Sequence, residues 1–109
     1  MKSTRYFSKK QEKAVAESLG GRTTPNSGAT LYSDGDVVIG KQFLLECKTS
    51  TVEKKSFSIK REWLDKLNRE RFNRGKESCA LVFNFGPRTP NYYVIDETLF
   101  KQLLIGGNE

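Results

Sequence analysis

The alternation of hydrophobic and polar residues predicts a short β-hairpin near the middle of the chain. The stretch DGDVVIGKQFLLECKTS, residues 34–50, holds two apolar runs separated by Gly40-Lys41-Gln42. A glycine between two such runs is typical of a turn. We therefore expect strands near 36–39 and 43–49.

Charged residues interrupt the apolar pattern of this hairpin. Asp36 opens the first strand, and Glu46 and Lys48 lie two residues apart on the second. Side chains two apart on a strand share a face. Glu46 and Lys48 should therefore point the same way, and a short turn brings Asp36 beside Glu46. The opposite face of the second strand is expected to meet the core through Phe43, Leu45 and Cys47.

A helical pattern precedes the hairpin. In residues 8–19 the i, i+3, i+4 and i+7 spacing is followed by Glu12, Val15, Ala16 and Leu19, with Ser8 as an expected N-cap and Gly20-Gly21 as the stop. Glu12 falls on the apolar face of this helix, together with Val15, Ala16 and Leu19. Residues 22–30 are rich in turn-forming residues and predict a polar connection.

A second helix is predicted from Ile59 to about Arg74, with Ser58 as its N-cap and Gly75 at its end. A polar, lysine-bearing loop precedes it. Its apolar stripe is expected to consist of Ile59, Trp63, Leu64, Leu67 and Phe72. Trp63, Leu64 and Phe72 suit either packing on the sheet or a contact with a second copy of the chain.

The remainder predicts strands in CALVFNF (79–85) and NYYVI (91–95), then a final helix that Asp96 caps and that runs to about Leu104. The expected order is α-β-β-(β)-α-β-β-α, or roughly αβββαββα. The predicted fold class is α/β, a mixed central β-sheet flanked by α-helices. At 109 residues the chain has room for a single domain, residues 1–109.

The amino-acid composition limits which binding partners and which kinds of catalytic or metal site the chain can have. The net charge of +6 favours a polyanionic partner, of which nucleic acid is the commonest. The absence of histidine excludes imidazole bases, Ser-His-Asp triads and mixed Cys/His zinc sites. The two cysteines match no metal-ligand spacing and are expected to be reduced. With no apolar run long enough for a signal peptide or a membrane span, a cytoplasmic protein is expected.

Two interpretations of the charged hairpin residues follow. In the first, Glu46 and Lys48 form an ordinary surface ion pair at a strand end. In the second, Asp36 and Glu46 share a hard cation such as Mg²⁺, which accepts one or two carboxylates plus water and substrate phosphate. Lys48 would then orient a water molecule or stabilise charge on a phosphate, which favours metal-assisted phosphodiester hydrolysis.

The order of these motifs resembles a known family. Glu12, then NSGA, GDVVI, LLECK and SFSIKREWLDKLNRERFNRGK are similar to the PD-(D/E)XK nuclease superfamily, within it most of all to small bacteriophage Holliday junction resolvases, which are relatives of the archaeal enzymes. The resemblance covers about residues 8–104. Gly35 stands where the pattern has its proline, a position that supplies no ligand.

The resemblance implies a restriction-endonuclease-like core and a set of site residues. Asp36, Glu46 and the backbone carbonyl of Cys47 would bind Mg²⁺, for which Mn²⁺ would substitute, and Lys48 would arrange the attacking water. Glu12 would complete the acidic cluster and could bind a second metal, while Ser27 would lie near the scissile phosphate. No small-molecule cofactor is implied. The activity implied is paired symmetric nicking of a four-way DNA junction by a homodimer.

The basic residues are expected to contact DNA phosphates and to make binding salt-sensitive. The positions favoured for this role are Arg22, Lys54, Lys55, Lys60 and Arg71. Two alternatives to junction resolution stay open. One is a nuclease of the same core acting on other DNA, of the restriction, mismatch-nicking or flap type, and the other is a basic nucleic-acid-binding module without catalysis.

Overall fold

The computed structural model describes residues 4–24 and 36–106. Within these ranges the chain is α/β, with a mixed five-stranded sheet and three helices in the order αβββαββα. The elements are α1 (Thr4–Leu19), β1 (Arg22–Thr23), β2 (Asp36–Ile39), β3 (Phe43–Lys48), α2 (Arg61–Asn73), β4 (Ser78–Phe83), β5 (Tyr92–Val94) and α3 (Glu97–Gly106). The predicted fold class is therefore confirmed at this level, and the extra strand is β1, before the hairpin.

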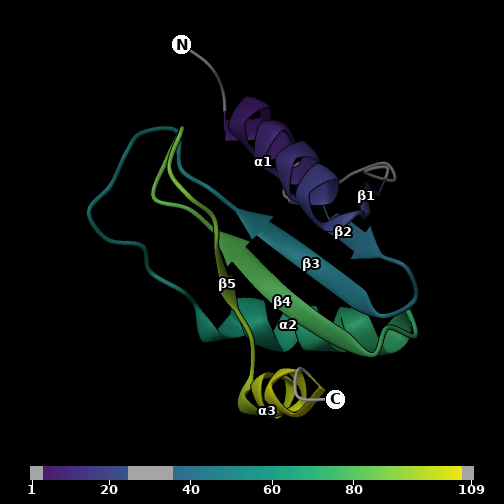
Figure 1. Ribbon diagram of the computed structural model, residues 1–109. Helices are drawn as coiled ribbons and strands as arrows, with labels where there is room; N and C mark the ends of the chain where they lie inside the picture. The colour runs from purple at the N-terminus through teal and green to yellow at the C-terminus, as the bar shows by residue number, and fades with distance from the viewer. Residues whose placement is uncertain (1–3, 25–35, 107–109) are drawn as a thin grey trace.

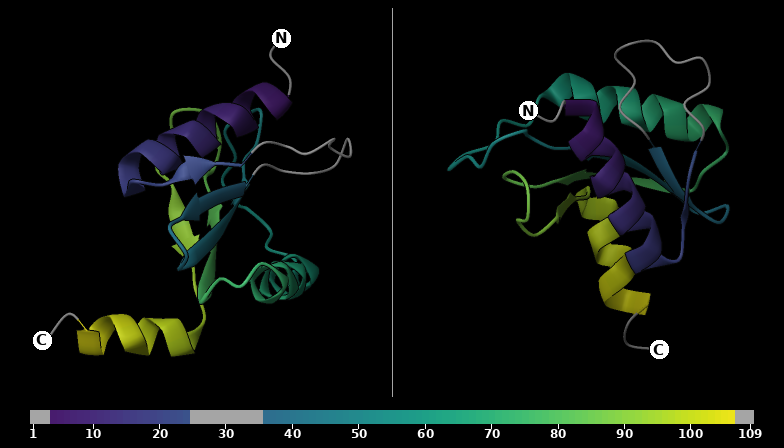
Figure 2. Two further views of the ribbon diagram at one scale, coloured as in Figure 1. Left: turned by 90° about the vertical axis from the view of Figure 1, so that its right-hand side faces the viewer. Right: turned by 90° about the horizontal axis from the view of Figure 1, so that it is seen from above.

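The strands lie in the order in which they occur along the chain, β1-β2-β3-β4-β5. All neighbours are antiparallel except β3 and β4, which are parallel. A parallel pair needs a crossover connection, and α2 supplies it. α1 and α2 consequently lie on opposite faces of the sheet, whereas α3 extends away from it (Figures 1 and 2).

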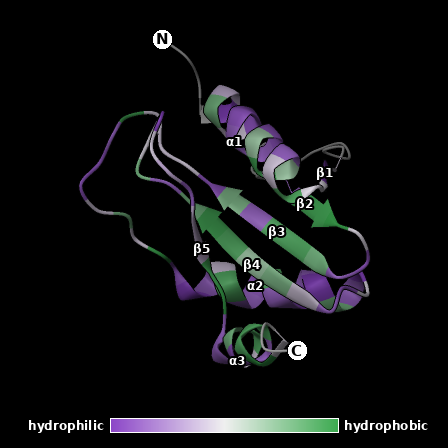
Figure 3. Cartoon of the chain, in the orientation of Figure 1, coloured by the Kyte–Doolittle hydropathy of each residue, from purple (hydrophilic) through white to green (hydrophobic). Residues whose placement is uncertain are grey.

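Two hydrophobic cores result, one on each face of the sheet. The α1-side core consists of Val15, Ala16, Val37, Leu45, Cys47, Ala80 and Val82. The α2-side core consists of Val38, Leu44, Leu67 and Leu81, with Trp63 and Leu64 packed against it. Strands covered on both faces carry mostly apolar residues, and Figure 3 shows the hydrophilic residues of β3 as an interruption in that pattern.

The predicted hairpin is confirmed. Its strands are joined by a turn in which Gly40 has φ +54° and the amide of Gln42 donates to the carbonyl of Ile39 at 3.2 Å. Glycine adopts such a φ without the steric cost that a side chain would add. Gly20 and Gly75 also have positive φ and end α1 and α2 as expected.

The predicted starts of the first two helices are wrong. α1 begins at Thr4, and Ser8 is buried inside it rather than capping it. α2 begins at Arg61, and its N-cap residue Lys60 makes no side-chain capping hydrogen bond. Ser58 lies in the preceding loop because the neighbouring Phe57 is packed against Phe83 and Trp63, which holds this segment out of the helix.

Parts of the predicted apolar faces are also wrong. Leu19 is exposed at the end of α1, shortly before the two-residue strand β1. Phe72 is 75% exposed, since it lies five residues after Leu67 and thus about 140° around the helix from it.

The cap of α3 is confirmed, because Asp96 Oδ1 accepts a hydrogen bond from the amide of Leu99 at 2.8 Å. Within residues 4–24 and 36–106, no helix is both long enough and apolar enough to cross a bilayer.

Candidate active site

The hairpin places two carboxylates side by side. Asp36 and Glu46 are directly opposite each other in the β2–β3 register, and Val38 opposes Leu44 two residues further along. Because side chains alternate across a strand, all four lie on the face that α2 covers. The expectation that Glu46 and Lys48 point away from Phe43, Leu45 and Cys47 is therefore confirmed.

A third carboxylate reaches this site from α2. Oxygen atoms of Asp36, Glu46 and Glu70 all lie within 4.8 Å of one another, and each of the three residues is partly buried. Glu70 is not among the site residues predicted from the sequence. The available signal was its spacing, because Glu70 follows Trp63 and Leu67 by seven and three residues and so shares their face of the helix.

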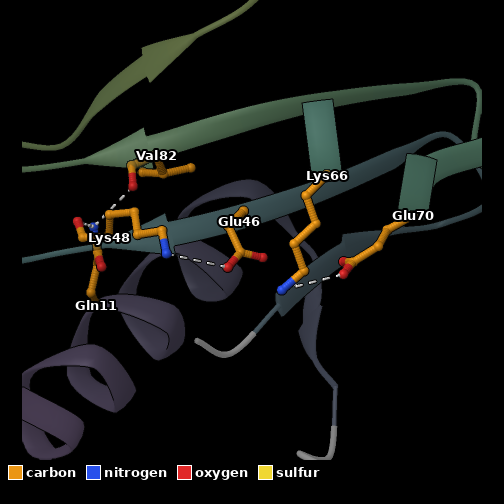
Figure 4. A network of polar contacts seen from close by, with 6 residues as sticks. All are labelled: Gln11, Glu46, Lys48, Lys66, Glu70 and Val82. Atoms are coloured by element: carbon orange, nitrogen blue, oxygen red, sulfur yellow. Dashed lines mark hydrogen bonds and ion pairs between the residues drawn. The ribbon is translucent and has the colours of Figure 1, made fainter. Parts of the chain in front are cut away.

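Each of these three carboxylates faces a cationic side chain. The Nη1 atom of Arg74 lies 2.8 Å from Asp36 Oδ2, and Lys48 Nζ lies 3.9 Å from Glu46 Oε1. Lys66 Nζ lies 3.8 Å from Glu70 Oε1, and Figure 4 shows both side chains reaching from α2 toward Glu46. Like charges this close repel each other, so these cations compensate the cluster when no metal ion is bound.

Lys48 is held in place by several contacts. Its Nζ atom lies 4.5 Å from the centre of the Trp63 ring, and its side chain is 17% exposed. Its backbone carbonyl accepts a hydrogen bond of 2.8 Å from Gln11 Nε2, which also contacts the carbonyl of Val82 (Figure 4). The same Nε2 atom contacts Asn91 Oδ1. Through Gln11, α1 therefore fixes the end of β3 against β4 and the loop that follows it.

An open cleft of about 330 Å³ lies between β3 and α2 beside the carboxylates. Its lining is mostly charged and consists of Glu46, Lys48, Glu62, Trp63, Lys66, Leu67, Arg69 and Glu70. Such a lining suits a charged, hydrated group better than an apolar ligand. Phosphate and a hard cation are the chemical groups that these side chains can bind.

The remaining predicted site residues are Glu12, Cys47 and Ser27. Glu12 is buried on α1, which covers the opposite face of the sheet, and it is not one of the three clustered carboxylates. Cys47 is a core residue with its side chain on the α1 side, and both cysteines are free thiols, as expected. Ser27 lies outside the described residues. The metal and phosphate roles expected of Glu12, Ser27 and the Cys47 carbonyl remain predictions.

Four of the five basic residues favoured for DNA contact are exposed: Arg22, Lys54, Lys55 and Lys60. Arg71 is half-buried, and its guanidinium donates to Asn68 Oδ1 and to the carbonyls of Lys76 and Glu77. It therefore fixes the connection between α2 and β4. Arg74, one turn of helix away, is the arginine that reaches the carboxylates.

Of the three hydrophobic residues considered for a contact between two copies, Trp63 and Leu64 pack in the α2-side core. Phe72 does not, and its ring remains available to a partner.

No protein-family model, curated protein or solved structure matches this chain. The function is therefore inferred from the site itself.

The donor set suits a hard divalent cation. Mg²⁺ prefers oxygen ligands and commonly binds through one or two carboxylates, water and a substrate phosphate. Asp36, Glu46 and Glu70 supply such oxygens at one place. Arg74 already contacts Oδ2 of Asp36, so a cation bound to this carboxylate would compete with the arginine for its negative charge.

Proposed function

We propose that the chain is a Mg²⁺-dependent DNA endonuclease with a restriction-endonuclease-like core, and that it resolves four-way junctions. The observation that carries the proposal is the convergence of Asp36, Glu46 and Glu70 beside Lys48 on a mixed sheet of the order αβββαββα. The basic surplus and the family resemblance of the sequence support DNA as the substrate.

Each residue of the site has a definable part in hydrolysis. Mg²⁺ held by Asp36, Glu46 and Glu70 would supply a Lewis acid for the phosphoryl oxygen and a more acidic water, and Mn²⁺ would replace it. The ammonium of Lys48, fixed by Glu46 and Trp63, orients a water molecule at the phosphate or stabilises its growing negative charge. Lys66 and Arg74 lie close enough to the same oxygens to meet the phosphates of the bound strand.

The test compares a labelled four-way junction with a linear duplex of the same sequence, each incubated with the protein and Mg²⁺. Paired symmetric nicks in the junction alone are expected. Asp36→Asn and Glu46→Gln should abolish cleavage while junction binding persists, since a repulsive charge near the phosphates is removed. Asp65→Asn is the matched control, because Asp65 is an exposed carboxylate of α2 that pairs with Arg61 outside the cluster.

Three results would contradict this proposal in different ways. Cleavage by both cluster variants would refute the site. Cutting of other DNA, such as a flap, a mismatch or a restriction sequence, would keep the nuclease but replace the substrate. Binding without cutting of any DNA by the wild-type protein would favour the binding module, with Asp36 and Arg74 as an ordinary ion pair.

We further propose that two copies associate, because paired nicks on opposing strands need two sites related by a two-fold axis. The described residues contain one three-carboxylate group per chain. α3 projects from the body (Figure 2). Its exposed apolar side chains are Phe100, Leu103, Leu104 and Ile105. Sedimentation of Phe100→Glu and Phe72→Glu variants would show which exposed surface pairs, and a wild-type monomer at assay concentrations would refute the dimer.

A further inference from the structure

Aromatic rings form a continuous stack on the α2 face of the sheet. The rings of Phe57 and Phe83 are 5.0 Å apart with an interplanar angle of 23°, and those of Phe83 and Tyr92 are 5.6 Å apart at 27°. Phe85 makes T-shaped contacts with both Phe83 and Tyr92. Three nearly parallel rings are thus arranged in the order Phe57, Phe83, Tyr92.

This stack begins beside the carboxylate site. Phe83 is the direct β4 neighbour of Lys48, and Tyr92 is the direct β5 neighbour of Phe83. With strands about 4.8 Å apart, Tyr92 lies about 10 Å across the sheet from Lys48. One nucleic-acid strand can therefore contact both places, with a phosphate at the carboxylates and a base a few nucleotides away at Tyr92.

The stack ends at the surface. Phe57, Phe83 and Phe85 are half-buried, whereas Tyr92 is 48% exposed and belongs to β5, the edge strand of the described sheet. A stack that only served the core would end against other protein groups. Here the terminal ring is available to a further planar group.

Basic residues lie on the loop that contacts Phe85, whose ring in turn packs against Tyr92. The amide of Lys54 donates to the carbonyl of Phe85 at 2.7 Å, so the loop after β3 lies along the loop between β4 and β5 (Figure 1). The contact is close, since a Cβ at Gly86 would lie 2.6 Å from Glu53 Cα. Lys54 and the neighbouring Lys55 are both exposed, and their charges can bind phosphates that flank a stacked base.

We infer that Tyr92 is a stacking platform for an unpaired nucleobase of the DNA strand that enters the carboxylate site. The inference rests on the proposed function and specifies its substrate further: DNA in which a base near the cleavage point has left the duplex stack, as at a branch or a bulge, in preference to intact duplex. Inside an intact duplex both faces of a base are covered by its neighbours, so a base has to leave that stack before it can lie on a protein ring. Stacking on an aromatic side chain contributes about 1–3 kcal/mol per base.

The test measures binding in the presence of chelator, so that no DNA is cut. Two fluorescein-labelled substrates are compared by anisotropy: a duplex with a three-nucleotide unpaired bulge and the same duplex fully paired. Tyr92→Leu should weaken binding of the bulged DNA by about 5-fold to 150-fold, the factor equivalent to one lost stacking contact. Binding of the paired duplex should change little, and Tyr92→Phe, which keeps the ring, should bind like wild type.

Tyr93→Leu is the matched control. Tyr93 is the next residue of β5, has similar exposure, and points to the opposite face of the sheet. It should leave both affinities unchanged. A second probe places 2-aminopurine in the bulge, where stacking on Tyr92 quenches its fluorescence in the wild-type protein and not in Tyr92→Leu.

The outcomes separate this inference from the proposed function. Equal binding of both DNAs by wild type and Tyr92→Leu, or no quenching with the wild-type protein, overturns the platform even if Asp36→Asn abolishes cleavage. Loss of bulge binding and quenching in Tyr92→Leu, in a protein that cuts no DNA, upholds the platform and refutes the nuclease. Equal loss in Tyr93→Leu also overturns the inference, because the effect would then not depend on the stack.

Discussion

Replacing Glu70 by glutamine tests whether the carboxylate cluster binds a metal ion. Glutamine keeps the size and polarity of the side chain and removes its charge. Oxygens of Asp36, Glu46 and Glu70 lie within 4.8 Å of one another, so an ion between them is closer than that to each. At 4.8 Å, one unit charge and a divalent ion attract by about 2 kcal/mol even at the dielectric constant of water. The expected effect of Glu70→Gln is therefore at least a ~30-fold loss of Mg²⁺ affinity.

The assay follows thermal unfolding as Mg²⁺ is added. A site with a Kd of about 1 mM stabilises the folded protein by about 1.4 kcal/mol at 10 mM Mg²⁺, and a 30-fold weaker site by only about 0.2 kcal/mol. The corresponding rise in Tm is roughly 6–11 °C for wild type and about 1 °C for the variant. Without Mg²⁺ the two proteins should have nearly equal stability, because the lost ion pair with Lys66 is offset by reduced repulsion from Asp36 and Glu46.

Glu62→Gln is the matched control for this experiment. Glu62 is an exposed carboxylate on the same helix and lines the same cleft, but it is not one of the three clustered residues. Its replacement should leave the Mg²⁺-induced shift unchanged. A full shift in Glu70→Gln, or an equal loss in Glu62→Gln, would refute the three-carboxylate site.

Three further predictions concern the charges around the site and the core. Arg74→Gln should tighten Mg²⁺ binding several-fold in a calorimetric titration, because the arginine and the ion compete for Asp36, and an unchanged affinity would argue against this competition. Ca²⁺ should support junction binding in a gel-shift assay with little cleavage, owing to its looser coordination, and full activity in excess chelator would exclude the metal mechanism. Burial raises the pKa of the Cys79 thiol above its ordinary value of 9.0, so its stabilising contribution is present below pH 9 and is lost as the pH rises through the folded-state pKa. Urea unfolding should therefore show wild type losing more stability than Cys79→Ser between pH 7 and about pH 10.5, and parallel losses would contradict this.

The hairpin could be predicted from sequence because every local signal agreed there. Gly40 suits the turn, the flanking residues are apolar, and the alternation sets which face each side chain takes. These local signals are sufficient to predict Asp36 beside Glu46. The helix starts failed where a tertiary contact outweighed local propensity, as at Ser58, where the packing of Phe57 keeps the chain extended.

Glu70 shows what the sequence could not provide. Its spacing places it on the buried face of α2, but only the crossover from β3 to β4 determines that this face lies over Asp36 and Glu46. If the helix packed elsewhere, the same spacing would place Glu70 among ordinary solvent-exposed charges. Which arginine pairs with Asp36 is equally a matter of helix rotation, and the structure selects Arg74 rather than Arg71.

In the proposed nuclease, the compensation of the cluster by Lys66 and Arg74 would link metal binding to DNA binding. Without a metal, Arg74 and Lys66 are engaged with Asp36 and Glu70. A divalent ion that neutralises the carboxylates frees both cations for the phosphates of a bound strand. The metal ion and the DNA strand then each increase the protein's affinity for the other, because both bind more tightly when the two cations are released from the carboxylates. We therefore expect Ca²⁺ to strengthen junction binding relative to chelator without efficient cutting. We also expect Arg74→Gln to lose much of that enhancement, even though it should bind the metal more tightly.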